Sequence, residues 1–222
     1  MSDFAAYVFY VNRPDLLERS LESFPDTLMH LTVINNSGGA IPNLAHKGCR
    51  IYRPLVPLTY SQSMNLMLED CLSLKADFII HFHSDAYTTN PNAVQELLAK
   101  VREYRDSGRR WSCAFSHYDL LWAVNPIALA DIGGWDTMFP AYFGDNDARR
   151  RWELAGWECI DTGIQGVQHE GSATINSDPD LQFLNGQTFP LYAHLYRQKW
   201  GGEPGKEVFT KPFNRDFRAA RS

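Results

Sequence analysis

The chain lacks any apolar run that approaches the roughly 20 residues required for a membrane-spanning helix. Its N-terminus also lacks the basic and then apolar layout of a secretory signal peptide. Both absences lead us to expect a cytoplasmic protein. At 222 residues, with 44% hydrophobic and 21% charged residues, the sequence has the composition of an ordinary globular protein that buries one sizeable core.

Two further features argue against a cysteine-based metal site and against general binding of nucleic acid. The four cysteines, Cys49, Cys71, Cys113 and Cys159, show no paired metal-ligand spacing, so we expect small core residues rather than a metal site. The net charge is −5, which argues against a general nucleic-acid binder. Neither internal repeats nor low-complexity segments are present, and the length and composition predict one domain with appendages.

The most informative stretch runs from Phe78 to Asp85, an almost unbroken apolar run that ends abruptly in polar residues. Such a run suits a strand that is covered on both faces. Ligands of open α/β sheets bind beyond the carboxyl ends of the strands, so His83 and Asp85 are expected where the chain leaves the sheet. The alternative is a simple turn, with Asp85 bonded to local backbone and His83 packed and satisfied.

Strand and helix patterns alternate over the first half of the chain. Strands are expected at 5–11, 31–35, 50–53 and 78–82, and helices at 14–24, at 91–106 and from a cap at Ser61 through Cys71. This alternation predicts βα units and a mostly parallel sheet flanked by helices. From Trp111 the regular crossovers stop, and shorter pieces are expected: strands at 111–115, 120–124 and 158–160, and helices at 127–132 and before Gly156.

Aromatic and acidic residues are interleaved between Trp135 and Asp147, just before a predicted helix. Aromatic faces beside carboxylates suit carbohydrate, since sugars present apolar C–H faces together with hydroxyl groups. The alternative is that the aromatics are core residues and that Asp145 stabilises the helix start without a catalytic duty. His169 follows on a glycine-flanked loop, and a lone histidine of this kind is more often structural than a ligand.

The order of these motifs resembles that of the inverting glycosyltransferases of the GT-A fold, in particular their large family 2. The similar motifs are Asn12-Arg13-Pro14, Val33 to Ser37, His83-Ser84-Asp85 at the DxD position, Gly133 to Asp136, Gly144 to Asp147 with Arg151, and His169 to Ser172. Each motif is weak alone, but together they follow the family's order across nearly the whole chain.

The resemblance implies an α/β, Rossmann-like single domain of the GT-A type. Its central sheet would be mostly parallel and flanked by helices, with a mixed acceptor-binding part and a helical C-terminal extension. Residues 1–110 would form the donor-binding half, 111–175 the acceptor-binding and catalytic half of the same domain, and 176–222 the extension.

The resemblance also assigns roles to residues of this chain. Asp145 would be the general base that deprotonates an acceptor hydroxyl, so that a sugar moves from a nucleoside diphosphate with inversion. Asp85, His169 and His83 would hold a divalent metal. Donor-binding residues would be Val11, Asn12, Arg13, Asn35, Asn65 and Ser84, and acceptor-binding residues would be Trp135, Asp136, Tyr142 and Asp147.

Three positions depart from the family pattern. Asn35 replaces the acid that meets the nucleobase, although its carbonyl can still accept the N3–H of uracil, and a UDP-sugar remains the favoured donor. His83 replaces the first acid of the DxD motif, and an imidazole suits Mn²⁺ better than Mg²⁺. Gly144 replaces the glutamate before Asp145.

Other functions stay open at this point. The losses at His83 and Gly144 favour a non-catalytic relic that binds sugar or nucleotide, whereas retention of Asp85, Asp145 and His169 favours an enzyme. A sugar nucleotidyltransferase is disfavoured because no glycine-rich phosphate loop follows the first strand. A retaining mechanism is also open. The acceptor can be a glycan, a lipid-linked sugar, a protein, a metabolite or modified nucleic acid, and the oligomeric state is not predicted.

Overall fold

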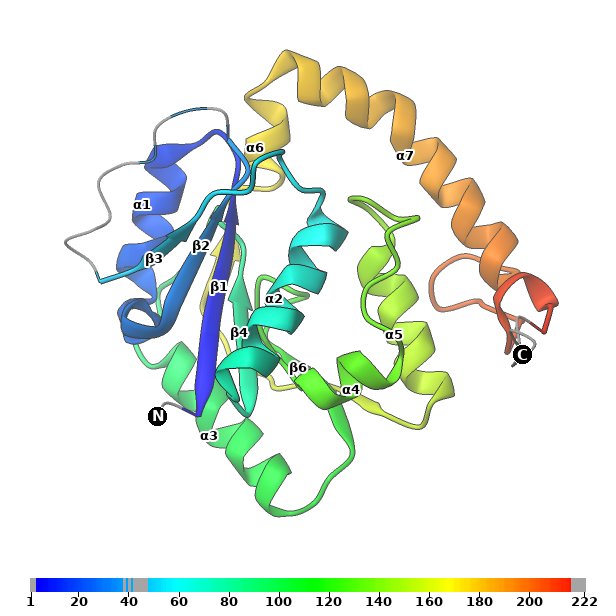
Figure 1. The fold of residues 1–222 in the computed structure, drawn as a ribbon, viewed down its shortest axis with the longest axis horizontal. Helices are drawn as coiled ribbons and strands as arrows, with labels where there is room; N and C mark the ends of the chain where they lie inside the picture. Colours follow the sequence, from blue (N-terminus) through cyan, green and yellow to red (C-terminus); the bar gives the residue numbers. More distant parts are fainter. Residues whose placement is uncertain (1–2, 38, 40, 42–47, 217–222) are drawn as a thin grey trace.

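The computed structural model describes residues 3–37, 39, 41 and 48–216, and Figure 1 shows their arrangement. In chain order, the first half contains β1 (Phe4–Tyr10), α1 (Pro14–Ser23), η1 (Pro25–His30), β2 (Leu31–Asn35), β3 (Arg50–Tyr52), α2 (Tyr60–Leu74), β4 (Phe78–Phe82), β5 (Ala86–Thr88) and α3 (Ala93–Asp106). The second half contains β6 (Trp111–Phe115), β7 (Leu121–Val124), α4 (Pro126–Asp131), α5 (Gly144–Leu154), β8 (Glu158–Asp161), β9 (Val167–His169), α6 (Ala173–Asn176), α7 (Pro179–Trp200) and η3 (Pro212–Asn214).

A single seven-stranded sheet has the order β3-β2-β1-β4-β7-β6-β8. Strands β1 to β4 pair in parallel, β7 runs antiparallel to both β4 and β6, and β8 is parallel to β6. The expected mostly parallel sheet, flanked by helices, is therefore confirmed. Because β6, β7 and β8 complete the same sheet, residues on both sides of position 110 belong to one continuous layer.

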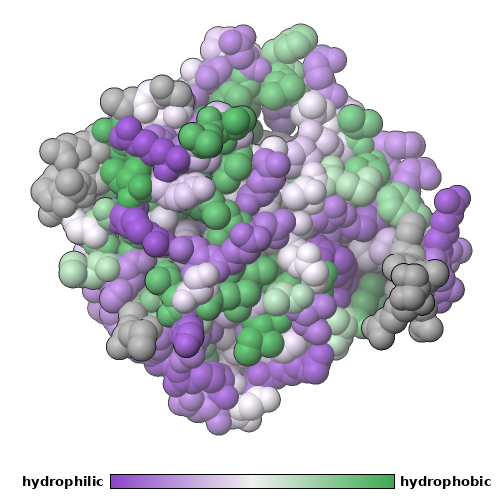
Figure 2. Space-filling model, viewed as in Figure 1, coloured by the Kyte–Doolittle hydropathy of each residue, from purple (hydrophilic) through white to green (hydrophobic). Residues whose placement is uncertain are grey.

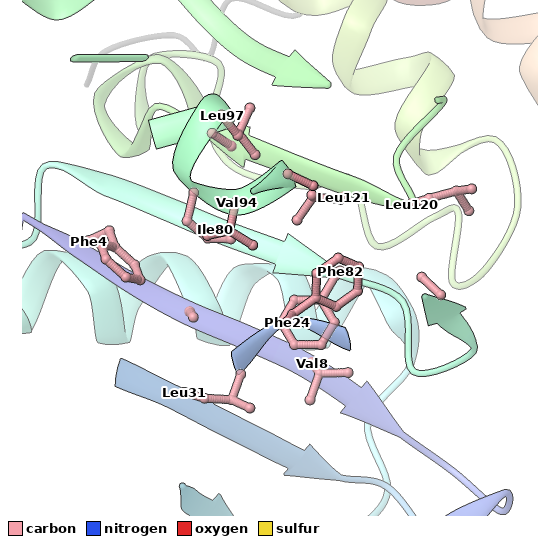
Figure 3. Close-up of a cluster of buried hydrophobic side chains, with 14 of the residues drawn as sticks. Phe4, Val8, Phe24, Leu31, Ile80, Phe82, Val94, Leu97, Leu120 and Leu121 are labelled. Atoms are coloured by element: carbon pink, nitrogen blue, oxygen red, sulfur yellow. The ribbon is translucent and has the colours of Figure 1, made fainter. Parts of the chain in front are cut away.

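Each central strand divides its side chains between two cores, because successive residues of a strand point to opposite faces. Phe4 and Val8 face the core that also contains the apolar sides of α1 and α3, whereas Tyr7 faces the core beneath α2, α4 and α5. Figure 3 shows the first of these cores, where Phe24 and Phe82 lie together with centroids 4.8 Å apart. The near-continuous apolar sequence of β4 follows from this burial on both faces.

The carboxyl ends of β1 and β4 lie side by side at one edge of the sheet. Their parallel register pairs Phe4 with Phe78 and Tyr7 with His81. From β1 the chain continues to β2 on one side, whereas β4 lies on the other side, so the strand order reverses between them. This reversal is the place where open α/β sheets bind ligands.

The C-terminal half of α7 packs against residues that precede α5, and Figure 1 shows the path of this helix. Tyr196 and Trp200 are buried against Phe139 in a third apolar cluster. Large apolar residues of the N-terminal half are exposed, including Phe183 at 70% and Leu184 at 55%. The face of the molecule drawn in Figure 2 mixes hydrophilic and hydrophobic residues.

Two local features differ from the sequence-based expectations. The helix α2 is capped by Thr59 rather than Ser61, because Thr59 and Gln62 form a reciprocal capping box. The short ladder of β5 with β9 was not predicted, since each strand has only three residues. Among the described residues, no helix combines the length and the apolar character needed to cross a membrane.

A buried ion network joins α7 to α5. The Nζ atom of Lys199, 4% exposed, lies 2.5 Å from a carboxylate oxygen of Asp136 and 2.5 Å from one of Asp147, which is 0% exposed. Asp147 also accepts hydrogen bonds from Arg151 Nε at 2.8 Å and Trp200 Nε1 at 2.9 Å. A buried carboxylate with this many partners fixes the angle at which α5 meets the C-terminal helix.

We expect Lys199→Met to lower the free energy of unfolding by about 3–5 kcal/mol, because it removes the buried cation that pairs with Asp136 and leaves the fully buried Asp147 with Arg151 as its remaining cation. Chemical denaturation followed by circular dichroism measures this change. Lys211→Met is the matched control, since its ion pair with Asp216 is exposed and should add little stability. Equal, small effects of the two substitutions would show that the network does not hold α7 in place.

Candidate functional site

The residues that follow β4 turn sharply away from the sheet. The amide of Ala86 donates to the carbonyl of His83 at 3.0 Å, and Ser20 Oγ of α1 donates to the same carbonyl at 3.2 Å. Asp85 lies within this turn and is only 7% exposed. A turn therefore follows β4, and Asp85 lies in it at the carboxyl edge of the sheet.

The β5–β9 ladder brings the region of His169 to this turn. Ala86, the neighbour of Asp85, is the direct register partner of His169. His169 is exposed, and its Nδ1 accepts the Gly171 N–H at 3.3 Å. Of the three predicted metal ligands, His169 thus belongs to this ladder and Asp85 immediately precedes it. In the part of the chain that the structure describes, no group of three His, Cys, Asp or Glu side chains converges as a metal site.

His83, the third predicted metal ligand, faces Asp119 instead. Its Nε2 lies 3.4 Å from Asp119 Oδ2, and both side chains are partly exposed. Burial favours the neutral carboxyl of Asp119, but the charge of nearby His83 outweighs it and lowers the pKa of Asp119. Burial also opposes a charged His83, yet Asp119 outweighs burial and raises the pKa of His83. The pair therefore favours imidazolium and carboxylate together.

Asp119 was not found by sequence reasoning. It lies in the turn between β6 and β7, within Ser116-His117-Tyr118-Asp119, which matches no motif. The structure places it at the site because β6 runs in the same direction as β4, so both strands end at the same edge. A polar turn after a predicted strand was the available signal, and strand direction was the missing information.

Aromatic rings line the site below His83. The Tyr60 ring lies 6.0 Å from His81, 6.2 Å from His83 and 6.3 Å from Trp135, centroid to centroid. Tyr60 OH, His81 Nε2 and Trp135 Nε1 are buried without a hydrogen-bond partner. Buried polar atoms normally have hydrogen-bond partners, so several unpaired polar atoms around one ring are suited to bind water or a polar ligand.

His81 and Tyr60 are neutral under physiological conditions. Burial lowers the pKa of His81 to about 3, and its Nδ1 accepts a hydrogen bond from Trp122 Nε1 at 2.9 Å. Burial, followed by the charges of Asp119 and Asp145, raises the pKa of Tyr60 well above its ordinary value. Both side chains can therefore donate hydrogen bonds to a ligand without adding charge.

Asp145 occupies the first turn of α5 and is partly buried. Burial raises the pKa of its carboxyl, and the nearby charge of Asp119 raises it further, while Arg149 opposes the shift. Phe143, the residue before the helix, has a φ of 67° and offers no side-chain cap. Asp145 thus lies at an uncapped helix start within electrostatic reach of Asp119 and Arg149.

The indole of Trp135 explains why the residue before Asp145 is glycine. A Cβ atom on Gly144 would lie 2.5 Å from Trp135 Nε1 and 3.2 Å from Ser61 Oγ. Contacts below 3.0 Å do not occur without movement of the neighbour, and Trp135 is only 2% exposed. The position of the missing glutamate is therefore closed to any side chain while Trp135 keeps this position.

The predicted donor residues lie at the ends of β1 and β2. Asn12 Nδ2 donates to Asp178 Oδ2 at 3.2 Å, so the start of α7 covers this end of β1. Arg13 is paired with Asp15 at 2.5 Å. Asn35 Oδ1 accepts both the N–H of Ser37 at 2.9 Å and its hydroxyl at 2.6 Å. Contact of these side chains with a nucleotide stays a prediction.

Three other predicted donor residues differ in their surroundings. Val11 and Ser84 are partly exposed beside the ends of β1 and β4. Asn65 lies on α2, where its Nδ2 donates to the Trp135 carbonyl at 2.9 Å and its Oδ1 accepts the Trp135 N–H at 2.7 Å. These two bonds use both ends of the amide, so the contacts assign Asn65 a structural role in holding Trp135.

The predicted acceptor residues pack within the protein. Trp135 and Asp147 are buried, and Asp136 is bound to Lys199 and to the Met138 amide. Tyr142 is partly buried with its ring 5.1 Å from that of Phe189 on α7. A fully buried carboxylate whose oxygens are both engaged does not contact an acceptor, and Asp147 therefore has a structural role instead.

A polar cleft of about 560 Å³ lies beside His169. Its walls are the start of the β6–β7 turn and the segment between β8 and β9, and they include Ser116, His117, Asp161, Gln165, Gln168 and His169. The predicted metal ligand His169 therefore lines this cleft. No sequence motif indicated that a cleft is present here.

Solved structures share this architecture. The mannosyltransferase PcManGT from Pyrobaculum calidifontis, in complex with GDP-Man and Mn²⁺, is 12% identical over 72% of this chain, with a TM-score of 0.52. Glucosyl-3-phosphoglycerate synthase from Mycobacterium tuberculosis, in complex with Mn²⁺, UDP and glucosyl-3-phosphoglycerate, is 13% identical over 86% of this chain and 78% of its own, with a TM-score of 0.56. The chain has a GT-A-type fold.

Other comparisons limit what this fold implies. A cytidylyltransferase from Leptospira borgpetersenii is 7% identical over 86% of this chain and 96% of its own, with a TM-score of 0.53. The chain spans 54% of the length of the mannosyltransferase. No family model and no curated protein matches the sequence. The GT-A-type fold therefore rests on structure alone.

We expect Gly144→Ala to lower the free energy of unfolding by about 1–3 kcal/mol, because the new methyl group collides with Trp135. The cost should shrink in a Trp135→Phe background, which removes the nearest atom, and a double-mutant cycle by denaturation measures this coupling. Gly186→Ala on α7 is the control, since its methyl group meets nothing within 4 Å. An equal cost in both backgrounds would contradict the steric explanation.

Proposed function

We propose that this protein is a glycosyltransferase that moves a sugar from a nucleoside-diphosphate sugar to an acceptor hydroxyl. One observation supports the proposal: Asp85 and Asp145 lie within electrostatic reach of His83 at the end of β4. His169 is the register partner of Ala86, the neighbour of Asp85, beside the reversal between β1 and β4. Open α/β sheets bind ligands at this reversal. The similar structures that hold nucleotides and Mn²⁺ support the same reaction class.

Asp85 and His169 would hold a divalent cation, with Mn²⁺ favoured by the imidazole. A carboxylate and a histidine without a third protein ligand fit a cation whose other positions are filled by phosphate oxygens and water. The Nδ1 of His169 is engaged by a long hydrogen bond of 3.3 Å, which is weak enough to be exchanged. When bound, the cation would neutralise the departing diphosphate. His83 stays with Asp119 in this assignment.

The donor would lie along the carboxyl ends of β1, β2 and β4, which carry Val11, Asn12, Arg13, Asn35 and Ser84. Asn35 would accept the uracil N3–H once one of its two bonds from Ser37 is released, which keeps a UDP-sugar as the favoured donor. The unsatisfied donors Tyr60 OH and His81 Nε2 would bind hydroxyl oxygens of the sugar.

Asp145 would act as the general base. A pKa raised by burial and by Asp119 brings the carboxylate nearer to the range in which it accepts a proton efficiently. Proton transfer to Asp145 would accompany attack of the acceptor oxygen on the anomeric carbon, with departure of the diphosphate and inversion. The lining of the polar cleft beside His169 would suit a polar acceptor.

A sugar nucleotidyltransferase is the second candidate, because the cytidylyltransferase matches 96% of its own length to this chain. Against it, the loop after β1 is Val11-Asn12-Arg13-Pro14, which has no glycine to cradle phosphates with backbone amides. A non-catalytic relic would bind nucleotide and leave an acceptor unmodified. Product analysis separates the three, since only the transferase releases a nucleoside diphosphate.

We expect Asp145→Asn to reduce turnover by roughly two to four orders of magnitude while donor binding is retained, as follows from loss of a general base. Release of nucleoside diphosphate from the donor measures turnover. Asp26→Asn is the control, because Asp26 is exposed on η1 at the opposite edge of the sheet. Near-normal turnover of Asp145→Asn would remove this residue from the role of base.

Removal of the metal should abolish nucleotide binding. Calorimetric titration with UDP, GDP, CDP and dTDP, in Mn²⁺ and then in chelator, is expected to show metal-dependent binding of one nucleotide, with UDP favoured. Asp85→Ala should lose this binding, whereas Asp106→Ala, at the far end of α3, should keep it. Equal affinity with and without chelator would contradict the metal assignment, and binding to none of the four would favour a relic.

A further inference from the structure

Cys113 and Cys159 are direct register partners on the neighbouring parallel strands β6 and β8. Neighbouring strands are about 4.8 Å apart, which lies inside the range of about 4.4–6.8 Å between the Cα atoms of a disulfide. Each thiol shifts the pKa of the other, so the two sulfur atoms lie close together. A register irregularity between Trp111 and Cys113 also interrupts the ladder at this point, which makes the backbone more adaptable here than in a regular pair.

The two thiols differ in exposure and acidity. Cys113 is fully buried, and its contact with Cys159 together with burial raises its pKa. Cys159 is exposed, and the hydrogen bond from Cys113, helped by Ser112 and the charge of Arg149, lowers its pKa to about 7. Ser112 Oγ lies 3.4 Å from Cys159 Sγ. An exposed, stabilised thiolate next to a protected thiol is the arrangement of an attacking and a resolving cysteine.

The other cysteines lack this arrangement. Cys71 is buried, its Sγ donates to the Ala76 carbonyl at 3.6 Å, and burial raises its pKa to about 12. Cys49 is partly buried against the core of α1 and α3. The expectation that all four cysteines are small core residues is therefore wrong for Cys159, because β8 is the edge strand of the sheet and leaves its side chain open.

We propose that Cys113 and Cys159 form a redox-active dithiol that is oxidised to an intrachain disulfide by a low-molecular-weight disulfide of the glutathione type. The Cys159 thiolate attacks one sulfur of the oxidant, its S–S bond breaks, and one thiolate leaves. Cys113 then loses its proton and attacks Cys159 Sγ, which closes the Cys113–Cys159 bond and releases the second thiolate. Two protein thiols are oxidised and one disulfide is reduced to two thiols. This reactivity is independent of the proposed transferase activity.

The test uses the full chain, incubated with oxidised glutathione and then alkylated for intact-mass and peptide analysis. We expect two of the four cysteines to escape alkylation without added glutathione mass. Trypsin should then yield Trp111–Arg149 joined to Trp152–Arg197, since neither segment contains an internal lysine or arginine. Four alkylated cysteines, or a wild-type product that stops at the glutathione adduct, would overturn the proposal.

Single variants separate the two roles. Cys113→Ser should accumulate a stable glutathione adduct on Cys159, because no resolving thiol remains, whereas Cys159→Ser should not react. Cys71→Ser is the matched control and should form the disulfide as the wild type does. A disulfide that forms in Cys159→Ser, or one that requires Cys71, would contradict the assignment. The wild-type peptide map decides the question even if a serine variant does not fold.

Discussion

The parallel pairing of β1 with β4 is the constraint on which the rest of the structure depends. Because β1 and β4 pair in parallel, the segments that follow Tyr10 and Phe82 leave the sheet at the same edge. This edge is where the strand order reverses. Every polar group of the candidate site is positioned relative to that edge. The strands can lie at the centre of the sheet only because helices bury both faces, which is why their sequences are almost entirely apolar.

A second layer of organisation comes from buried polar contacts that fix the helix carrying Asp145. Asp147, two residues further along α5, is held by Lys199, Arg151 and Trp200. Asn65 holds the backbone of Trp135, whose indole in turn packs against Gly144. These buried contacts hold the start of α5 in place. Asp147 is used in them, whereas Asp145 of the same turn lies within electrostatic reach of Asp119 at the site. Preorganisation of this kind suits a group that must meet a proton in one geometry.

The site itself combines charge with unsatisfied hydrogen-bond donors. His83 and Asp119 form a pair at its mouth, and neutral Tyr60 and His81 present donors beneath them. A protein that only needed stability would leave fewer buried polar atoms without partners, since each costs desolvation energy. A bound ligand rich in hydroxyl groups would form these missing hydrogen bonds and offset the desolvation energy.

The sequence by itself determined the fold class, the place of most strands and helices, and the importance of the segment after Phe82, because apolar periodicity and chain breakers are local signals. It did not reveal Asp119, the Cys113–Cys159 pair or the structural role of Asp147. These depend on which strands run in the same direction, which strand is at the edge, and which carboxylates are buried by α7. The contacts of Lys199 with Asp136 and of Trp200 with Asp147 join residues more than 50 positions apart, so only tertiary packing decides whether a carboxylate faces solvent, a cation or another helix.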